Sequence, residues 1–279
     1  MTITSPVTIP AAPTITSSVV LVTPSITAAV TVPTVSAGAL ITSPLASWSA
    51  TSGVSGSPVD AWSSQTYQTF IGAGSGRPTI SANFKPGIGI KFDGSNDIIS
   101  TTDATVFPQL SPAGGCVIFA FRLTSVGSDQ VIFSTTSTTL SNVYFNIGVK
   151  SSGKIWIDWA AGSAANSGSA IGTAVLSINT DYVIAVKVGV DPLLWSAYIN
   201  GVEDALNYTA GANFYVFNNK WFFDVSLINK EFLVGATRLL GVVTNPFNGV
   251  IGTCRFWKPT LSVSDCLAMS ADISSQWTS

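Results

Sequence analysis

The stretch that decides the fold is CVIFAFRL at residues 116–123, in which valine, isoleucine and phenylalanine dominate. β-Branched and aromatic residues of this kind are typical of strands. Further runs of the same character lie outward from it between turn residues, at 89–92, 130–134, 143–149, 154–159, 181–190, 194–200, 231–236 and 250–257. Many short strands with frequent turns predict an all-β sandwich or barrel.

Helical periodicity appears only near the C-terminal end of the sequence. Ser262 precedes Asp265 by three positions, which is the spacing of a capping box. We therefore expect one short helix that opens there and continues through about Ala271.

The chain carries few charges for its length. Only 9% of its 279 residues are charged and 46% are hydrophobic, whereas about 25% of an average globular protein is charged. Such a composition excludes a disordered chain, and a surface with few charges tends to associate. We expect the protein to work inside an assembly. The net charge of −2, without any run of Lys or Arg, argues against a nucleic-acid partner.

The residues needed for common hydrolytic chemistry are missing. The sequence has no histidine, which removes the Ser-His and Cys-His nucleophile systems. A retaining glycosidase needs two carboxylates about 5 Å apart, but the only glutamates are Glu203 and Glu231. Glu203 and Asp204 are adjacent, so they would face opposite sides of a strand. The sequence therefore predicts a protein that is not an enzyme.

The three cysteines, Cys116, Cys254 and Cys266, show no CxxC spacing. An odd and sparse set is not a disulfide framework. We interpret them as three buried small side chains, in line with the usual burial of free cysteine and with assembly in a reducing cytoplasm. A pairing of Cys254 with Cys266 is the alternative.

Residues 1–44 differ from the rest of the chain. They contain no charged side chain, and prolines stand at positions 6, 10, 13, 24, 33 and 44 between short alternating runs. Alternation predicts extended structure, while the prolines exclude a central strand. We expect an extended Thr/Val/Pro-rich arm that serves as an anchor or in oligomerisation; a flexible linker is the alternative, although linkers are usually Gly/Ser-rich or charged.

Targeting signals are not apparent in the sequence. The N-terminal MTITSPVTIP has no basic region of the kind that opens a secretory signal. No stretch reaches the roughly 20 apolar residues of a membrane helix, so we expect no membrane insertion.

Several segments together resemble laminin-G-like, concanavalin-like jelly-roll domains over about residues 45–277. They are GRPTISANFKPGIGIKFDGSNDIIS at 76–100, CVIFAFRL at 116–123, AYINGV at 197–202 and the run from Phe247 to Trp257. The Asn200-Gly201 pair is itself a signal for a type I′ hairpin turn. The resemblance implies an antiparallel jelly-roll β-sandwich at 45–279, with the arm at 1–44 and one short C-terminal helix.

A jelly roll preceded by a Thr/Val/Pro-rich arm also resembles virion proteins of tailed bacteriophages. This resemblance implies a capsid decoration or head-fibre protein on the virion surface, assembled in the host cytoplasm. Its partners would be major capsid or other virion proteins, reached through the arm, and further copies of the chain, with a trimer as the expected symmetry. A tail-fibre or receptor-binding adhesin and a free carbohydrate-binding lectin are the alternatives, and cell-surface glycans are the candidate ligands.

An aromatic segment follows the Asn-Gly hairpin at residues 203–232. Three interpretations stay open: the aromatic side chains form the core of extra strands, they form a partner interface, where aromatic residues are enriched, or they stack on sugar rings. The candidate binding residues are Tyr208, Phe214, Tyr215, Phe217 and Trp221.

Two further features have both a structural and a functional interpretation. Asp93, Asn96 and Asp97 offer oxygen ligands that suit Ca²⁺, yet Asp-Gly and Ser-Asn-Asp are also turn formers. No EF-hand spacing supports the metal, and no other cofactor is expected. Trp156 and Trp159 stand three positions apart in one expected strand, so one should lie in the core and the other at the surface or an interface.

Overall fold

The computed structural model describes residues 46–51, 53–56, 58–63, 69–72, 76–84, 87–102, 114–162, 167–189, 195–210, 230–257 and 263–278. The expected arm at 1–44 and most of the aromatic segment lie outside the described residues, so the interpretations of both stay predictions.

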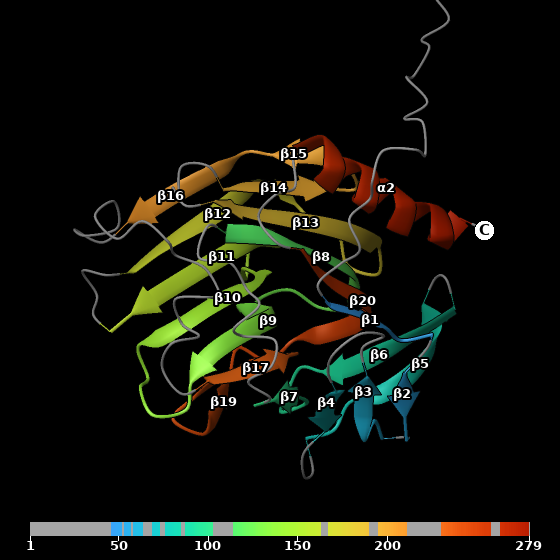
Figure 1. The fold of residues 1–279 in the computed structure, drawn as a ribbon, viewed down its shortest axis with the longest axis vertical. Coiled ribbons are helices and arrows are strands. Elements are labelled where there is room, and N and C mark those ends of the chain that lie inside the picture. Colours follow the sequence, from blue (N-terminus) through green and yellow to red (C-terminus); the bar gives the residue numbers. More distant parts are fainter. Residues whose placement is uncertain are drawn as a thin grey trace, which may run out of the picture. The chain divides into compact units, whose positions relative to one another are not determined.

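Two antiparallel sheets face each other (Figure 1). The eight-stranded sheet has the order β15-β14-β13-β8-β20-β6-β5, with β1 paired to β20. Its strands are β1 (Ala46–Ser49), β5 (Thr79–Phe84), β6 (Gly87–Asp93), β8 (Gly114–Leu123), β13 (Asp181–Gly189), β14 (Ser196–Ile199), β15 (Val202–Asp204) and β20 (Asn248–Trp257).

The ten-stranded sheet has the order β16-β12-β11-β10-β9-β17-β7-β4-β3-β2. Its strands are β2 (Val54–Ser55), β3 (Ala61–Ser63), β4 (Thr69–Gly72), β7 (Ile99–Thr101), β9 (Gln130–Ser137), β10 (Val143–Val149), β11 (Lys154–Ala161), β12 (Ser167–Val175), β16 (Leu206–Ala210) and β17 (Lys230–Val234). A separate hairpin joins β18 (Thr237–Leu239) to β19 (Val242–Thr244). The expected antiparallel β-sandwich is confirmed.

The space between the sheets is filled with aromatic side chains. Phe133 of the ten-stranded sheet and Phe256 of the eight-stranded sheet have ring centroids 4.9 Å apart. Phe145 and Trp195 pack at 5.8 Å in the same buried cluster. Each such side chain contributes roughly 1.5–3 kcal/mol by leaving water, so this layer holds the two sheets together.

Strand β8 is buried on both of its faces, which explains why CVIFAFRL is apolar throughout. Val117, Phe119 and Phe121 belong to the sandwich core. Ile118 and Ala120 point to the other side, where they pack in the cluster that includes helix α2 (Val263–Thr278). A strand covered on both faces loses the apolar–polar alternation of a half-exposed strand.

Helix α2 exists as predicted, but its expected end near Ala271 is wrong, because the helix continues to Thr278. Cys266, Met269 and Ile273 form its buried stripe against the eight-stranded sheet, at the i, i+3 and i+7 spacing of an amphipathic helix. Ile273 extends the stripe past the expected end, and its burial against the sheet stabilises the helix beyond Ala271. No helix among the described residues is long and apolar enough to cross a membrane.

The predicted Asn-Gly hairpin turn is confirmed. Asn200 and Gly201 join β14 to β15 with φ of 50° and 81°, the positive pair that a type I′ turn requires.

Cys116, Cys254 and Cys266 are buried thiols, as expected. The alternative pairing of Cys254 with Cys266 is wrong: Cys254 belongs to the sandwich core and Cys266 to the cluster under α2.

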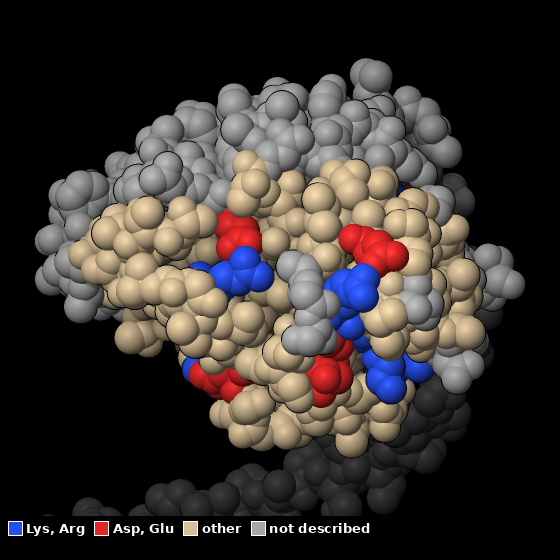
Figure 2. All heavy atoms as spheres, turned by 90° about the horizontal axis from the view of Figure 1, so that it is seen from below, with Lys and Arg blue, Asp and Glu red and all other residues tan. Residues whose placement is uncertain are grey.

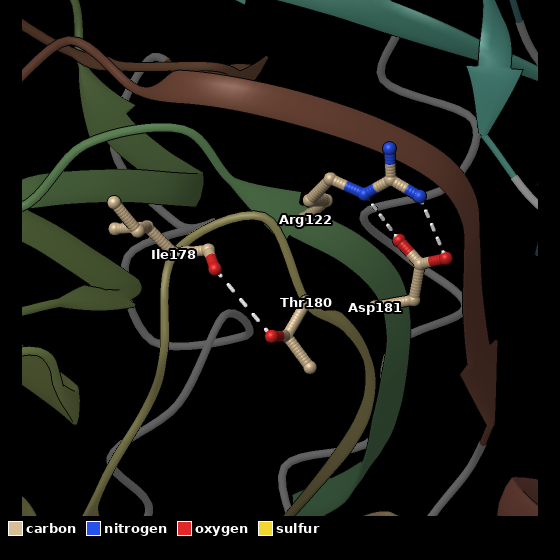
Figure 3. Close-up of polar contacts among 4 residues, drawn as sticks. All are labelled: Arg122, Ile178, Thr180 and Asp181. Atoms are coloured by element: carbon tan, nitrogen blue, oxygen red, sulfur yellow. Dashed lines mark hydrogen bonds and ion pairs between the residues drawn. The ribbon is translucent and has the colours of Figure 1, made fainter.

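On the face shown in Figure 2, positively and negatively charged side chains stand beside one another. Arg122 on β8 and Asp181 on β13 are cross-strand neighbours that form a two-pronged pair, with Nε–Oδ1 and Nη2–Oδ2 distances of 2.5 and 2.8 Å (Figure 3). Thr180 caps the preceding turn by donating to the Ile178 carbonyl. Further ion pairs among the described residues are Arg77–Asp60, Lys150–Asp129, Arg238–Glu231 and Arg255–Asp272.

Candidate functional site

The outer face of the ten-stranded sheet carries a line of polar side chains, which we call the polar row. Strand register places Thr209, Ser169, Asp158, Asn146 and Ser134 opposite one another on β16, β12, β11, β10 and β9, the strands that run in sequence across the sheet in Figure 1. At about 4.8 Å between strands, the row spans about 19 Å.

Simple alternation along β10 and β11 creates this row. In β10, Phe145 and Ile147 enter the sandwich core, so the intervening Asn146 points outward. In β11, Ile157 and Trp159 enter the core, and Asp158 points outward beside Asn146. The apolar partners thus fix the direction of both polar side chains.

The row is open at one end and closed at the other. Thr209 is exposed, Ser169 and Asp158 are half-buried, and Asn146 and Ser134 are buried. The closed end lies at the β18–β19 hairpin, where the Ser134 hydroxyl donates to Thr237 Oγ1 at 3.0 Å. The exposure of the side chains therefore falls along the row from Thr209 to Ser134.

Aromatic side chains flank the row on both sides. Tyr144 lies two positions before Asn146 on β10, and Trp156 lies two positions before Asp158 on β11. Lys150 Nζ is 4.5 Å from the centroid of the Trp156 ring, a cation–π contact, and also pairs with Asp129. The Lys150–Trp156 pair therefore lies beside the row.

The two tryptophans are placed differently from the expectation in one respect. Trp159 is fully buried in the core, as predicted for one of them. Trp156 lies on the opposite face, as expected, but it is only 6% exposed, so the expectation of an exposed ring is wrong; the interface alternative stays a prediction. The Lys150 side chain above the ring contributes to its cover.

Asp158 has the perturbed electrostatics that burial produces. Removal from water raises the pKa of Asp158 to about 6, although hydrogen bonds from the Tyr144 side chain and the Trp159 backbone favour its carboxylate. Burial and the adjacent Asp158 also raise the pKa of Tyr144. Near neutral pH the row therefore holds one carboxylate whose charge is costly and which gains from further hydrogen-bond donors.

A buried polar atom without a partner lies next to this carboxylate. Within the described part of the chain, Asn146 Oδ1, on the residue opposite Asp158, is buried and has no hydrogen-bond partner. A buried polar atom left unpaired costs about 1–3 kcal/mol. The register puts Asn146 between Asp158 and Ser134, so a hydroxyl-bearing ligand in the row would offset that cost.

The structure describes one of the five aromatic candidates. Tyr208 lies on β16, packs against the sandwich core and donates its hydroxyl to the Trp195 carbonyl at 2.9 Å. It points inward, whereas its neighbour Thr209 lies in the polar row, so the two do not share a face. This placement agrees with the interpretation as the core of an extra strand. Phe214, Tyr215, Phe217 and Trp221 lie outside the described residues, and their role in binding stays a prediction.

The Asp93, Asn96 and Asp97 segment forms a tight turn after β6. Asp97 Oδ2 accepts from the Asp93 amide at 2.9 Å, and Asp93 Oδ1 accepts from the Ser95 amide at 2.8 Å. Burial raises the pKa of Asp97. Both carboxylates thus hold the turn, which is the structural interpretation; a Ca²⁺ ion at this place stays a prediction, and no cluster of three His, Cys, Asp or Glu side chains occurs among the described residues.

Sequence reasoning missed the polar row, although part of its signal is present. Tyr144, Asn146, Trp156 and Asp158 are the outward positions of two strands that the sequence did predict. Their alignment across strands depends on register, which single strands do not encode.

No protein-family model and no curated protein sequence matches the chain. Similar folds occur among solved structures. Domain 4 of AbnA, a GH43 extracellular arabinanase from Geobacillus stearothermophilus, in complex with arabinotriose, covers 81% of this chain and 98% of its own, with 17% identity and a TM-score of 0.55. The CBM40 of the Ruminococcus gnavus IT-sialidase, bound to α2,3-sialyllactose, covers 65% and 96%, with 17% identity and a TM-score of 0.53.

A third similar structure, the NanB sialidase from Streptococcus pneumoniae, covers 68% of this chain and 27% of its own at 16% identity and a TM-score of 0.51. The first two similar structures are a carbohydrate-binding module and a domain in complex with a trisaccharide. At these identities the likeness concerns the fold. The chain thus has the jelly-roll β-sandwich fold found in carbohydrate-binding modules.

Proposed function

We propose that this chain is a non-catalytic glycan-binding β-sandwich that docks an oligosaccharide along the polar row. The observation that carries the proposal is the buried, unpartnered Asn146 Oδ1, which lies between Asp158 and Ser134 in a row of hydrogen-bonding side chains. The two similar structures with bound sialyllactose and arabinotriose support this choice of ligand class.

The chemistry of the row suits neutral sugars. Hydroxyl groups both donate and accept, so they can satisfy the Asp158 carboxylate and the Asn146 amide oxygen together. The row contains one carboxylate, Asp158, and the Lys150 ammonium beside the row is already paired with Asp129. An acidic sugar would meet like charge at Asp158, so neutral oligosaccharides are the favoured class.

The test is a glycan array followed by calorimetry, with arabinotriose as the neutral and sialyllactose as the acidic reference probe. Asn146→Ala should lower affinity for a neutral oligosaccharide about tenfold or more, since one hydrogen bond in a buried site is worth about 1–3 kcal/mol. Asn96→Ala, which changes an exposed turn residue, is the matched control. Absence of neutral-glycan binding, or equal affinity in both variants, contradicts the proposal.

A second proposal concerns where the module works. The uncharged, proline-punctuated arm at 1–44 and the charge-poor composition favour a structural protein of a bacteriophage virion, a capsid decoration or head fibre. In this proposal the arm binds capsid or other virion proteins, and copies self-associate, for example as a trimer. A tail-fibre adhesin and a free lectin are the competing roles.

Electron microscopy with an antibody against residues 100–279 distinguishes these roles. Label on virion heads supports decoration, label on tails supports the adhesin, and particles without label support the free lectin. Deletion of residues 1–40 should abolish incorporation; truncated protein at the full copy number would contradict the anchoring role.

A further inference from the structure

Two of the three cysteines meet beneath helix α2. Cys116 Sγ on β8 and Cys266 Sγ on α2 lie 3.0 Å apart, although the residues are 150 positions apart in the sequence. Both side chains are fully buried. The third cysteine, Cys254, is buried in the sandwich core, in a different cluster.

We propose that Cys116 and Cys266 are a disulfide-forming pair that fastens α2 to the eight-stranded sheet when the chain folds in the presence of a small-molecule disulfide. A disulfide needs its sulfur atoms about 2.05 Å apart, so the thiols need approach by only about 1 Å. This cross-link is independent of glycan binding, because α2 covers the outer face of the other sheet.

The surroundings favour reaction at Cys266. Lys187 on β13 is the cross-strand partner of Cys116, which places an ammonium group beside the sulfur pair. The hydrogen bond with Cys116, together with Lys187, outweighs burial and lowers the pKa of Cys266, while the same hydrogen bond and burial raise the pKa of Cys116. Thiolate is the reactive form, so as α2 approaches the sheet Cys266 is the attacking group and Cys116 the resolving group.

The reaction balances as two thiol–disulfide exchanges with glutathione disulfide. The Cys266 thiolate attacks one sulfur of glutathione disulfide, which forms a mixed disulfide and releases one glutathione thiolate. Cys116 loses its proton to solvent or to that thiolate and attacks Cys266 Sγ, which forms the intramolecular bond and releases the second glutathione. The two cysteines are oxidised by two electrons, and one glutathione disulfide is reduced to two thiols.

Access to the sulfurs sets when the exchange occurs. Neither cysteine is exposed while α2 lies on the sheet, so an oxidant reaches them only during folding or when α2 detaches. After the bond has formed, the same cover protects it from reductants. The cross-link therefore holds α2 on the sheet covalently, whereas without it the helix is held by the packing of Met269, Ile273 and their neighbours.

The experiment refolds the full chain from denaturant with either glutathione disulfide or excess dithiothreitol. Free thiols are then alkylated under denaturing conditions and counted by intact mass. We expect one alkylated cysteine, Cys254, after oxidative refolding and three after reduction. Peptide mapping without reduction should recover the Cys116–Cys266 cross-link, and the melting temperature should rise by roughly 5–15 °C.

Three variants make the result specific. Cys254→Ala should keep the cross-link and the rise in melting temperature, whereas Cys116→Ala and Cys266→Ala should lose both. Peptide mapping of the unaltered chain decides the question even if a variant does not fold. Three alkylated thiols after oxidative refolding, or a cross-link that contains Cys254, would overturn the proposal.

Discussion

At the scale of single residues, Asp158 makes the stability of the protein depend on pH. Its pKa of about 6 lies above the ordinary 3.8, so the folded state binds this proton more tightly than the unfolded chain. The stabilising contribution is complete below about pH 4 and is lost as the pH rises through 6. The ionised carboxylate therefore lowers the free energy of unfolding at neutral pH.

We compare the free energy of unfolding of Asp158→Asn with that of the unaltered chain at two pH values. The difference, variant minus unaltered chain, should be about 1–3 kcal/mol more positive at pH 7.5 than at pH 4, because only the ionised Asp158 is costly. Denaturant titrations at the two pH values measure this difference. Asp129→Asn is the control of opposite sign: burial alone would raise the pKa of Asp129, but Lys150 and the Ser151 amide lower it. If Asp158→Asn changed the free energy of unfolding by the same amount at both pH values, the raised pKa of Asp158 would be contradicted.

At the scale of elements, β10 depends on the absence of a side chain at Gly148. A Cβ there would lie 2.0 Å from the Gln130 carbonyl oxygen and 2.9 Å from Val131 Cα, at the register shift between β9 and β10. Both obstacles are backbone atoms of the neighbouring strand, so the side chain could be accommodated only by moving that strand.

Gly148→Ala should therefore destabilise the protein by roughly 2–4 kcal/mol and disturb the polar row through Asn146. Gly162→Ala is the matched control, because its φ of 87° is strained for alanine while its surroundings are open; it should cost about 1–2 kcal/mol. Thermal melting compares the two, and an equal loss would show that crowding at Gly148 is not the cause.

Some strands could be predicted from the sequence alone and others could not. Strands such as β8 and β10 were predictable because β-branched and aromatic residues mark them. Strand β12, SGSAIGTAV, was missed because small residues carry little strand preference; its place follows from pairing with β11 and β16. The polar row was missed for the same reason, since Asn146 and Asp158 become neighbours only through register.

At the scale of the whole molecule, the predicted boundary between arm and sandwich, at residues 44 and 45, falls next to β1. Residues Ala46 to Ser49 pair with β20, and the Ala50 amide donates to the Gly252 carbonyl. A chain that begins at Leu45 keeps this pairing, whereas one that begins at Ala50 loses it and leaves this edge of β20 without its partner strand.

The Leu45 chain should melt in one cooperative transition, and the Ala50 chain should melt at least several degrees lower, since each lost kcal/mol shifts the melting temperature of a domain this size by about 2–4 °C. Circular dichroism measures both. Loss of cooperative melting in the Leu45 chain would show that residues 1–44 complete the core.

The central claim is that a neutral glycan lies along the polar row. Backbone amide NMR of the Leu45 chain, titrated with arabinotriose and with the strongest neutral binder from the array, tests it most directly. If a neutral glycan binds there, saturable shifts should centre on residues 143–149, 154–161 and 167–175, and they should disappear in Asn146→Ala but persist in Asn96→Ala. Saturable shifts confined to other strands, or none with any neutral glycan, would contradict it.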